Sequence, residues 1–371
     1  MGKRRNWHSL PRSACDARPV SIRCSVARLE AFVAQALVAV GVRPDHAQVT
    51  ARRLVEADLR GRTGHGIIRL PLYIDRIVAG AINLRPDIRT VHQTPVSALV
   101  DGDNGLGQVV MTLAVETAIE KAKASGLAWV GTRRSNHAGA AGVYSAMAMR
   151  EDLIGIYCAV ASANVMPPWG GRERLLGTNP LAVSIPAGEE VPFQLDIATT
   201  VASHGTIKVK AQAGESMPEG WVIDLDGNPI THPERADEGF LMPIGGYKGS
   251  GLNLAIGMLA GIMNGAAFGR EVIDHRVVLD RPADTGQAIL VLRPDLFLGI
   301  DEFKTEMDRQ LRMLRGSESM TDEPVQLAGE RAVAVETQRR QDGVPVPDPL
   351  LAKLRALAER LGLDDRLDEK E

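Results

Sequence analysis

The chain has 371 residues, 44% of them hydrophobic and 24% charged, so it can bury a sizeable core as one large domain or two intertwined domains. A formal net charge of −3 excludes the overall basic surface that attracts nucleic acid or an anionic membrane. The three cysteines have no metal-ligand spacing and are too few for a disulfide framework. No apolar run reaches about 18 residues, which excludes a membrane-spanning helix. We therefore expect a cytoplasmic globular protein that binds no metal.

The N-terminal part begins with a segment that we expect to lie outside the folded domain. Residues 1–24 are basic and aperiodic and lack the apolar stretch of a signal peptide, which predicts a disordered or over-long extension. Ser25 then suits the N-cap of a helix that Gly41 ends, and Pro44 suits the start of a second helix.

The stretch RTGHGIIRLPLY, residues 62–73, sets polar side chains at regular intervals in an apolar context. His65, Arg69 and Tyr73 recur every four residues, which on a helix would place all three on one side. Pro71 has no backbone N–H to donate, so a continuous helix through all three would be broken or kinked.

Arg69 and His65 together have the chemistry to handle a small acid. A guanidinium grips a carboxylate with two parallel hydrogen bonds, and a histidine with an ordinary pKa of about 6.5 exchanges protons near neutrality. The pair therefore suits a 2-oxo or 2-hydroxy acid. The alternative is that Arg69 pairs with Asp58 or another surface acid and that His65 merely packs.

The middle of the chain alternates between strand and helix patterns and predicts an α/β fold. Short β-like runs such as LAWVG, LIGIYCAV, LAVSIP and FQLDIA are separated by turns and helical stretches. GSGLNLAIGMLAGIMNGAAFG predicts an apolar helix that must be buried. From about Ala332 the chain turns polar, with a Pro-rich joint VPVPDP before a terminal amphipathic helix.

The glycine turn GLGQVV, residues 105–110, has the position of a Rossmann pyrophosphate loop between a strand and a helix. Val110 stands where the third glycine belongs. The next strand continues into Arg133 and Arg134, without the acid that would bind a ribose diol. A standard Rossmann site is therefore not expected.

Three further glycine-rich segments favour a phosphorylated cofactor. SNHAGAAG carries His137, and GTNP and GGYKGSG follow later, the second with the positive charge of Lys248. Small residues let a ligand approach the backbone, whose N–H groups bind phosphate. For His137 alone, the alternative is a turn histidine that caps a helix.

An ordered set of motifs resembles the malate/L-lactate dehydrogenase family, which includes ureidoglycolate and sulfolactate dehydrogenases and piperideine-2-carboxylate reductases. The motifs are GHGIIRLPLY, SNHAGAAG, PPWGG, GTNP, DIATT, PEGWVIDLDGNP, GGYKGSGL and GERA. We assign residues 25–331 to one oxidoreductase domain of this type and residues 332–371 to a charged C-terminal segment with a terminal helix. The resemblance implies a mixed-sheet, non-Rossmann α/β fold of the L-sulfolactate dehydrogenase-like type, NAD or NADP as cofactor, and a homodimer.

The resemblance also implies roles for individual residues. His65 and His137 match active-site histidines, Arg69 matches a carboxylate-binding arginine, and Tyr73 matches a pocket tyrosine. We favour His137 as proton donor because it matches the residue nearest the nicotinamide, with the reverse assignment left open. The residues that fall on cofactor-lining segments are His137, Gly139, Thr178, Tyr247, Lys248, Gly329, Glu330 and Arg331.

Three positions depart from the family pattern. Gly64 replaces a usual serine, Thr206 replaces a charged or polar residue that is often lysine, and His232 replaces a common aspartate. The reaction class is still predicted to be hydride transfer between a nicotinamide and a small 2-hydroxy or 2-oxo acid. One alternative is an NAD(P)H-dependent reductase of a cyclic imine carboxylate. The other is a non-catalytic nucleotide or acid sensor, motivated by Gly64 and Thr206.

Overall fold

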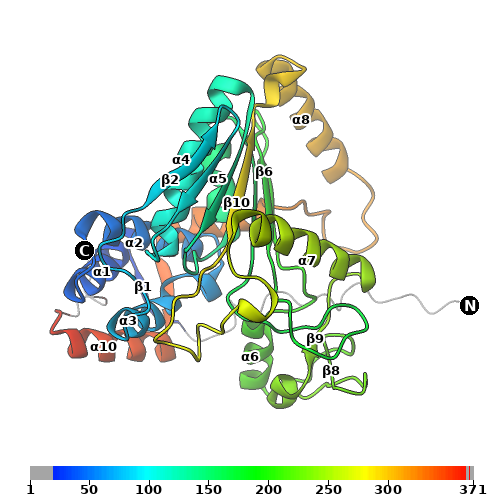
Figure 1. Cartoon of the computed structure of the whole chain (residues 1–371). Helices are drawn as coiled ribbons and strands as arrows, with labels where there is room; N and C mark the ends of the chain where they lie inside the picture. The colour runs from blue at the N-terminus through cyan, green and yellow to red at the C-terminus, as the bar shows by residue number, and fades with distance from the viewer. Residues whose placement is uncertain (1–19, 365–366, 368–371) are drawn as a thin grey trace, which may run out of the picture.

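The computed structural model describes residues 20–364 and Leu367 and contains a mixed seven-stranded sheet with the order β2-β3-β4-β10-β5-β6-β7 (Figure 1). Within this sheet β3 and β4 are parallel, and all other neighbouring strands are antiparallel. This mixed sheet confirms the predicted fold class and differs from the parallel sheet of a Rossmann domain. The strands are β2 (Arg89–Thr94), β3 (Ser97–Asp101), β4 (Leu127–Arg133), β5 (Ile154–Ala159), β6 (Leu181–Ile185), β7 (Phe193–Ile197) and β10 (Gln287–Leu292).

Helices cover both faces of the sheet. α4 (Gly107–Ser125) and α5 (Ala141–Met149) lie on one face, and α7 (Tyr247–Ala260) lies on the other (Figure 1). α4 is the crossover that the parallel pair β3 and β4 requires. Under α4 and α5 the core combines aliphatic side chains with the stacked rings of Tyr144 and Tyr157, and Met111 and Ile289 are fully buried in it.

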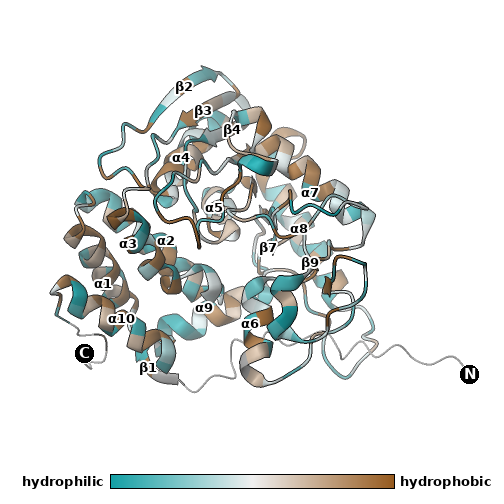
Figure 2. Ribbon diagram, turned by 60° about the horizontal axis from the view of Figure 1, so that its bottom comes forward, coloured by the Kyte–Doolittle hydropathy of each residue, from teal (hydrophilic) through white to brown (hydrophobic). Residues whose placement is uncertain are grey.

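The N- and C-terminal helices form a second apolar core beside the sheet. Its side chains include Leu37, Leu54, Ile74 and Leu354, each 0% exposed. Figure 2 shows α1 and α10 side by side in this part of the molecule. Its helices are α1 (Val26–Ala39), α2 (Pro44–Leu59), α3 (Leu70–Val78) and α10 (Asp348–Leu361), and α9 (Glu330–Asp342) contacts α2 beside this core.

Helix starts in this second core follow the sequence signals. The Ser25 hydroxyl accepts a hydrogen bond from the backbone N–H of Arg28 and caps α1, as expected. Pro44 stands in the first turn of α2, where its missing donor costs nothing.

Two segments predicted to lie outside the oxidoreductase domain contribute strands to this second core. β1 (Val20–Cys24), at the end of the expected extension, pairs antiparallel with β11 (Val344–Pro347), which contains the Pro-rich joint. Alternation explains the strand, because Val344 and Val346 are buried while the prolines between them face outward and need not donate. Residues 1–19 of the expected extension lie outside the described residues.

The remaining elements form a small lobe and an outlying helix. The lobe consists of α6 (His204–Ala213), β8 (Val222–Ile223), a 3-10 segment (Pro233–Glu238) and β9 (Phe240–Leu241) around its own apolar cluster. α8 (Ile300–Arg315) follows β10 and the 3-10 turn Pro294–Leu296, and projects at the top right of Figure 1.

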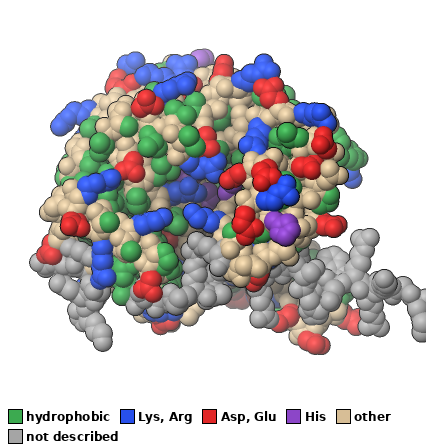
Figure 3. Space-filling view, turned by 90° about the horizontal axis from the view of Figure 1, so that it is seen from below, with side chains coloured by type: hydrophobic (Ala, Val, Ile, Leu, Met, Phe, Trp, Pro, Cys, Tyr) green, Lys and Arg blue, Asp and Glu red, His purple; other side chains and the backbone are tan. Residues whose placement is uncertain are grey.

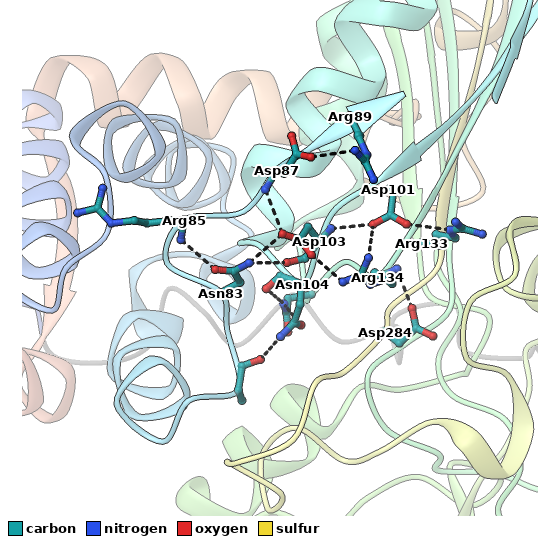
Figure 4. Close-up of polar contacts among 12 residues, drawn as sticks. Asn83, Arg85, Asp87, Arg89, Asp101, Asp103, Asn104, Arg133, Arg134 and Asp284 are labelled. Carbon is teal, nitrogen blue, oxygen red and sulfur yellow. Dashed lines mark hydrogen bonds and ion pairs between the residues drawn. The ribbon is translucent and has the colours of Figure 1, made fainter. Parts of the chain in front are cut away.

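A charged network closes the ends of β3 and β4 next to the glycine turn (Figure 4). Arg133 donates to Asp101 at 3.1 Å, and Arg134 donates to Asp101 at 3.1 Å and to Asp103 at 2.6 Å. The backbone N–H of Arg134 donates to Asp284 at 2.7 Å. Arg133, the last residue of β4, and Arg134 after it are therefore held by neighbouring acids.

The apolar helix α7 is only half buried, contrary to the prediction that it must be buried. Ser250, Asn253, Gly257 and Ala260 face the protein, because they are small enough for close packing on the sheet. Larger side chains of α7 and the following 3-10 turn (Ile262–Asn264) point outward. The exposed ones are Leu252, Met258, Leu259, Ile262 and Met263.

Two features of the described residues bear on function. No helix in that part of the chain is long and apolar enough to cross a membrane. Those same residues contain no cluster of three or more His, Cys, Asp or Glu side chains that could hold a metal ion.

Candidate active site

The GHGIIRLPLY stretch folds into two 3-10 turns followed by α3. The turns span Thr63–His65 and Ile67–Arg69, and α3 begins directly after them with Pro71 in its first turn. Pro71 thus separates His65 from the helix that carries Tyr73, as its missing donor predicts. The three side chains come together through the turns rather than through one helical face.

A buried carboxylate beneath this stretch fixes its backbone. Asp58, at the end of α2, is 3% exposed and accepts a hydrogen bond of 2.7 Å from the Ile67 N–H. A Cβ on Gly66 would lie 2.1 Å from Asp58 Oδ1, so only glycine lets the backbone wrap the carboxylate this closely. Burial raises the pKa of Asp58 to about 7, although the Ile67 N–H and the charge of Arg339 act in the opposite direction.

The SNHAGAAG loop brings His137 against His65. The two imidazole rings stack with centroids 5.6 Å apart and an interplanar angle of 18°. Gly139 has a φ of +88°, and a Cβ there would lie 3.4 Å from the His65 carbonyl oxygen. A Cβ on Gly107 would lie 2.1 Å from the Asn136 carbonyl oxygen. The glycines of the Rossmann-like turn therefore allow α4 to pack directly against the loop that carries His137.

The hydroxyl of Tyr73 lies between His137 and a buried glutamine. Tyr73 Oη is 2.6 Å from His137 Nδ1, and Gln108 Nε2 donates to Tyr73 Oη at 3.0 Å. The Gly139 N–H also points at His137 Nδ1, at 3.3 Å. Gln108 is 0% exposed. The sequence predicts Tyr73 on the pocket wall. It does not predict a role for Gln108, because a glutamine in a glycine turn carries no distinctive sequence signal.

A third histidine that the sequence did not single out belongs to this cluster. His275 is 5% exposed, and its ring meets that of His137 edge-on with centroids 5.1 Å apart. The buried Arg76 of α3 donates to the carbonyl oxygens of His275, Val278 and Arg281 at 3.4, 2.6 and 2.8 Å. α3 thus supplies Tyr73 and also anchors the segment carrying His275, which has no recognisable motif.

Arg69 is oriented by the backbone and makes no ion pair within the described part of the chain. Its Nε donates to the Gly64 carbonyl oxygen at 2.7 Å. Asp58 is turned toward Ile67 instead, so the alternative of an Arg69–Asp58 salt bridge is wrong. With Nε engaged, the remaining guanidinium N–H groups are available to a planar anion such as a carboxylate.

The site is cationic and disfavours charged histidines. Burial, followed by the charge of Arg69, lowers the pKa of His65 and of His275 to about 3. Burial and the neighbouring His275 and Arg69 also hold the pKa of His137 well below its ordinary value. Figure 3 shows Lys and Arg side chains gathered with histidine in a hollow in the middle of one face. The ordinary pKa assumed from the sequence is therefore corrected, and all three imidazoles are neutral near pH 7.

The GTNP and GGYKGSG segments are joined by a buried amide network. Asn179 Nδ2 donates to Asn253 Oδ1 at 2.9 Å, and Asn253 Nδ2 donates to the Thr199 hydroxyl at 2.7 Å. Thr199 in turn donates to the Thr178 carbonyl oxygen at 3.0 Å. This network holds Thr178 and the DIATT segment against the first half of α7.

The N-terminus of α7 has free backbone donors beside an aromatic ring. Gly246 has a φ of +65° and precedes the helix without a side-chain cap, and a Cβ there would lie 3.5 Å from the Trp169 ring. Tyr247 and Lys248, in the first turn, are exposed. No hydrogen bond or ion pair links these two side chains to His65 or His137 among residues 20–364.

The GERA segment lies at the start of α9 against β7. A Cβ on Gly329 would lie 2.9 Å from the Gln194 N–H nitrogen, and Gly329 has a φ of +106°. Glu330 accepts from Arg315 at 2.6 Å and from the Leu327 N–H at 2.9 Å. Glu330 is thus committed to local contacts, while Arg331 is exposed.

The three departures from the family pattern fall in different surroundings. A Cβ on Gly64 would have nothing within 4 Å, so a serine side chain would fit at this position. Thr206 lies in the first turn of α6 and contacts the hydroxyl of Ser203 at 3.0 Å. His232 is exposed at the start of a 3-10 segment. Of the three, Gly64 alone directly adjoins the histidine cluster in sequence.

The residues present fit a nicotinamide dinucleotide and an acid substrate. His65 Nδ1 is buried without a hydrogen-bond partner in the described structure, so a ligand atom can satisfy it. The open N-terminus of α7 with Lys248 offers donors for phosphate. The donor set is cationic and includes Arg69, which forms no ion pair in the described part of the chain, and it therefore suits a substrate carboxylate and the cofactor phosphates.

Comparison with known proteins gives consistent matches over most of the chain. A family model described as malate/L-lactate dehydrogenase matches residues 24–355. L-sulfolactate dehydrogenase of Methanocaldococcus jannaschii is 40% identical over 324 residues, which cover 87% of this chain and 93% of the relative. Ureidoglycolate dehydrogenase (NAD(+)) of Escherichia coli strain K12 is 34% identical, with 77% and 81% covered. (2R)-3-sulfolactate dehydrogenase (NADP(+)) of Chromohalobacter salexigens is 30% identical, with 92% and 98% covered.

Solved structures match the same fold. Malate dehydrogenase of Pyrococcus horikoshii superposes with a TM-score of 0.85 at 34% identity, covering 93% of this chain and 98% of that one. Delta1-piperideine-2-carboxylate reductase of Pseudomonas syringae superposes with a TM-score of 0.81 at 27% identity, covering 91% and 100%.

Proposed function

The chain belongs to the malate/L-lactate dehydrogenase family, and we propose that its histidine cluster and Arg69 form the site of its NAD(P)-dependent oxidation and reduction of small 2-hydroxy and 2-oxo acids. The observation that carries the proposal is the guanidinium of Arg69, which makes no ion pair among the described residues, beside the stacked rings of His65 and His137. A carboxylate bound there leaves the adjacent oxo carbon next to an imidazole.

Each side chain of the proposed site has a distinct task. Arg69 holds the substrate carboxylate through the N–H groups that do not contact Gly64. His137 hydrogen-bonds the reacting oxygen and moves its proton, and His65 offers its unpartnered Nδ1 to the substrate. The bound nicotinamide supplies or accepts the hydride. The protein contributes orientation, a proton path and a cationic surrounding for the acid.

Substrate binding also affects the histidines. The charge of Arg69 lowers the pKa of His65, His137 and His275 in the free protein. A substrate carboxylate on Arg69 offsets that charge, so the same imidazoles become better proton acceptors once substrate is bound. Binding and proton transfer are thereby coupled through one guanidinium.

We assign the cofactor to the glycine-rich segments and to residues beside them. The open N-terminus of α7 and the asparagine network behind it support phosphate binding there. His137 and Gly139 would lie beside the nicotinamide. The further residues proposed to line the cofactor are Thr178, Tyr247, Lys248, Gly329, Glu330 and Arg331.

A cyclic imine carboxylate is the second candidate substrate. The structural likeness to a piperideine-2-carboxylate reductase favours it. The same Arg69 grip would serve, and the acceptor would be C=N in place of C=O. Non-catalytic binding as a sensor has less support, since His65, His137 and Arg69 are all present and the two imidazole rings stack.

We further propose that the chain forms a homodimer through the outward face of α7. Met258 of α7 and Ile262 and Met263 of the 3-10 turn that follows it are 47%, 56% and 62% exposed, and exposed apolar side chains of this size mark an interaction surface. Ile262 also borders an adjacent hollow of about 530 Å³ that Ala267 and Phe268 line. A second copy would cover this apolar surface. We assign the protein to the cytoplasm, where the buried thiol of Cys158 stays reduced.

The test of the proposed activity is a cofactor oxidation assay. Purified protein is mixed with NADH or NADPH and a panel of 2-oxo acids and cyclic imine carboxylates, and cofactor absorbance is followed. We expect oxidation that depends on a 2-oxo acid. Turnover of imines alone would favour the second candidate, and turnover of neither class would reject both.

A further inference from the structure

The hydrogen bonds around Tyr73 have a defined direction. The Gln108 amide nitrogen can only donate, so Tyr73 Oη accepts from it at 3.0 Å. The Gly139 N–H also can only donate, so His137 Nδ1 presents its lone pair at 3.3 Å. The proton of Tyr73 then has two acceptors on His137, Nδ1 at 2.6 Å and the carbonyl oxygen at 3.4 Å, and the much shorter contact assigns it to Nδ1. His137 then carries its proton on Nε2.

The surroundings keep both groups in these protonation states. Burial and neighbouring positive charges hold the pKa of His137 well below its ordinary value, so its ring is neutral at pH 7. Burial raises the pKa of Tyr73 to about 12, so its hydroxyl keeps its proton. A neutral imidazole can give up its Nε2 proton without becoming an imidazolate only if Nδ1 gains one at the same time.

We propose that Tyr73 is the proton partner of His137, and that Gln108 is the positioning residue that directs the Tyr73 hydroxyl to His137 Nδ1. The inference rests on the proposed function and adds to it the route of the proton. It goes beyond a role of Tyr73 as a pocket wall.

The reductive step balances as follows. A hydride reaches the oxo carbon, and the C=O π electrons become a lone pair on the oxygen. That oxygen takes the proton of His137 Nε2, while Nδ1 takes the proton of the Tyr73 hydroxyl. The phenolate left on Tyr73 keeps the O–H electron pair and takes its proton back from His137 Nδ1, while Nε2 takes a proton from solvent water after the product leaves, which releases hydroxide and restores the starting tautomer. Arg69, whose charge lowers the pKa of Tyr73, and the Gln108 N–H stabilise the transient phenolate.

The first measurement needs no substrate. The full chain is labelled with 15N-histidine, and His137 is identified as the signal absent from His137→Asn. At pH 7 we expect the neutral form with the proton on Nε2. In Tyr73→Phe we expect a mixture of tautomers, because Nδ1 loses its strongest donor. A proton on Nδ1, or a charged ring, in the unaltered protein would overturn the proposal.

The second measurement follows single turnovers in mixtures of H2O and D2O, which isolates the chemical step from product release. Because two protons are transferred in the same step, the rate of the unaltered protein should depend on the deuterium fraction along a curve. Tyr73→Phe should slow the step roughly 10²–10⁴-fold and give a linear dependence, with a smaller change in KM. Gln108→Met should slow it about tenfold. A linear dependence in the unaltered protein, with an unchanged rate in Tyr73→Phe, would contradict the relay.

Tyr144→Phe is the matched control. The Tyr144 hydroxyl is equally buried and donates to the Ala138 carbonyl oxygen at 2.6 Å, in the same loop, without contacting an imidazole. It should keep the His137 tautomer and the curved dependence. If no substrate is turned over, the proposed function fails, while the histidine spectra still decide whether Tyr73 sets the tautomer.

Discussion

Replacing Arg69 by lysine separates the shape of the cation from its charge. The guanidinium Nε already donates to the Gly64 carbonyl oxygen at 2.7 Å, which leaves the N–H bonds of Nη1 and Nη2 for the substrate carboxylate. Lysine keeps the positive charge but offers a single nitrogen without the planar fork. The variant therefore loses one hydrogen bond to the carboxylate and the bond to Gly64.

The size of the effect follows from the lost bond. A hydrogen bond to a charged group is worth about 1.5–3 kcal/mol, and each 1.36 kcal/mol is a factor of ten. We expect kcat/KM for a 2-oxo acid to fall roughly 10- to 150-fold. Most of the fall should be in KM, because the carboxylate is gripped in the ground state and in the transition state alike.

The assay is steady-state oxidation of NADH or NADPH at saturating cofactor with the best 2-oxo acid of the panel. Arg270→Lys is the control, since Arg270 makes a bidentate pair with Glu173 on the surface at 2.7 Å. The control should match the unaltered protein. A kcat/KM within twofold of the unaltered protein in Arg69→Lys would remove Arg69 from the substrate site.

Further predictions concern the support of the site and the assembly. Gly66→Ala should destabilise the protein by about 1–3 kcal/mol and reduce kcat, because its Cβ would lie 2.1 Å from Asp58 Oδ1. Urea unfolding measures the loss of stability, and steady-state turnover measures kcat. Because the folded-state pKa of Asp58 is raised to about 7, its contribution to stability is fully present below the unfolded-state value near 3.8 and is lost as pH rises through 7. The stability of Asp58→Asn relative to the unaltered protein should therefore increase between pH 5 and pH 8, and a constant difference would contradict the raised pKa. Ile262→Asp combined with Met263→Asp should convert a dimer into monomers in sedimentation, and an unaltered protein that sediments as a fully active monomer would reject the α7 interface.

The fold class and the order of elements could be read from the sequence because they depend on local periodicity. The N-cap Ser25 and the placement of Pro71 in the first turn of a helix follow from single-residue backbone chemistry. The sequence predicts a linker where the strand Val344–Pro347 lies, since prolines at alternate positions are typical of a joint between elements. Its role as an edge strand depends on a partner more than 300 residues away.

The site was predictable only where residues carry a motif. His65, Arg69, Tyr73 and His137 were singled out and the structure brings them together. His275 was missed because nothing in its segment marks it, and its place depends on Arg76 gripping three backbone carbonyl groups. The histidine pKa values also depend on burial and on charges that the fold assembles, which sequence spacing cannot give.

The central claim is that hydride passes between a nicotinamide and the carbon next to the carboxylate held by Arg69. The direct measurement uses NADH or NADPH carrying deuterium at C4 of the nicotinamide, with the product examined by NMR and mass spectrometry. The claim predicts deuterium on the carbon that bears the new hydroxyl group, transferred from one face of the cofactor. Oxidised cofactor with no deuterium in the product would contradict it.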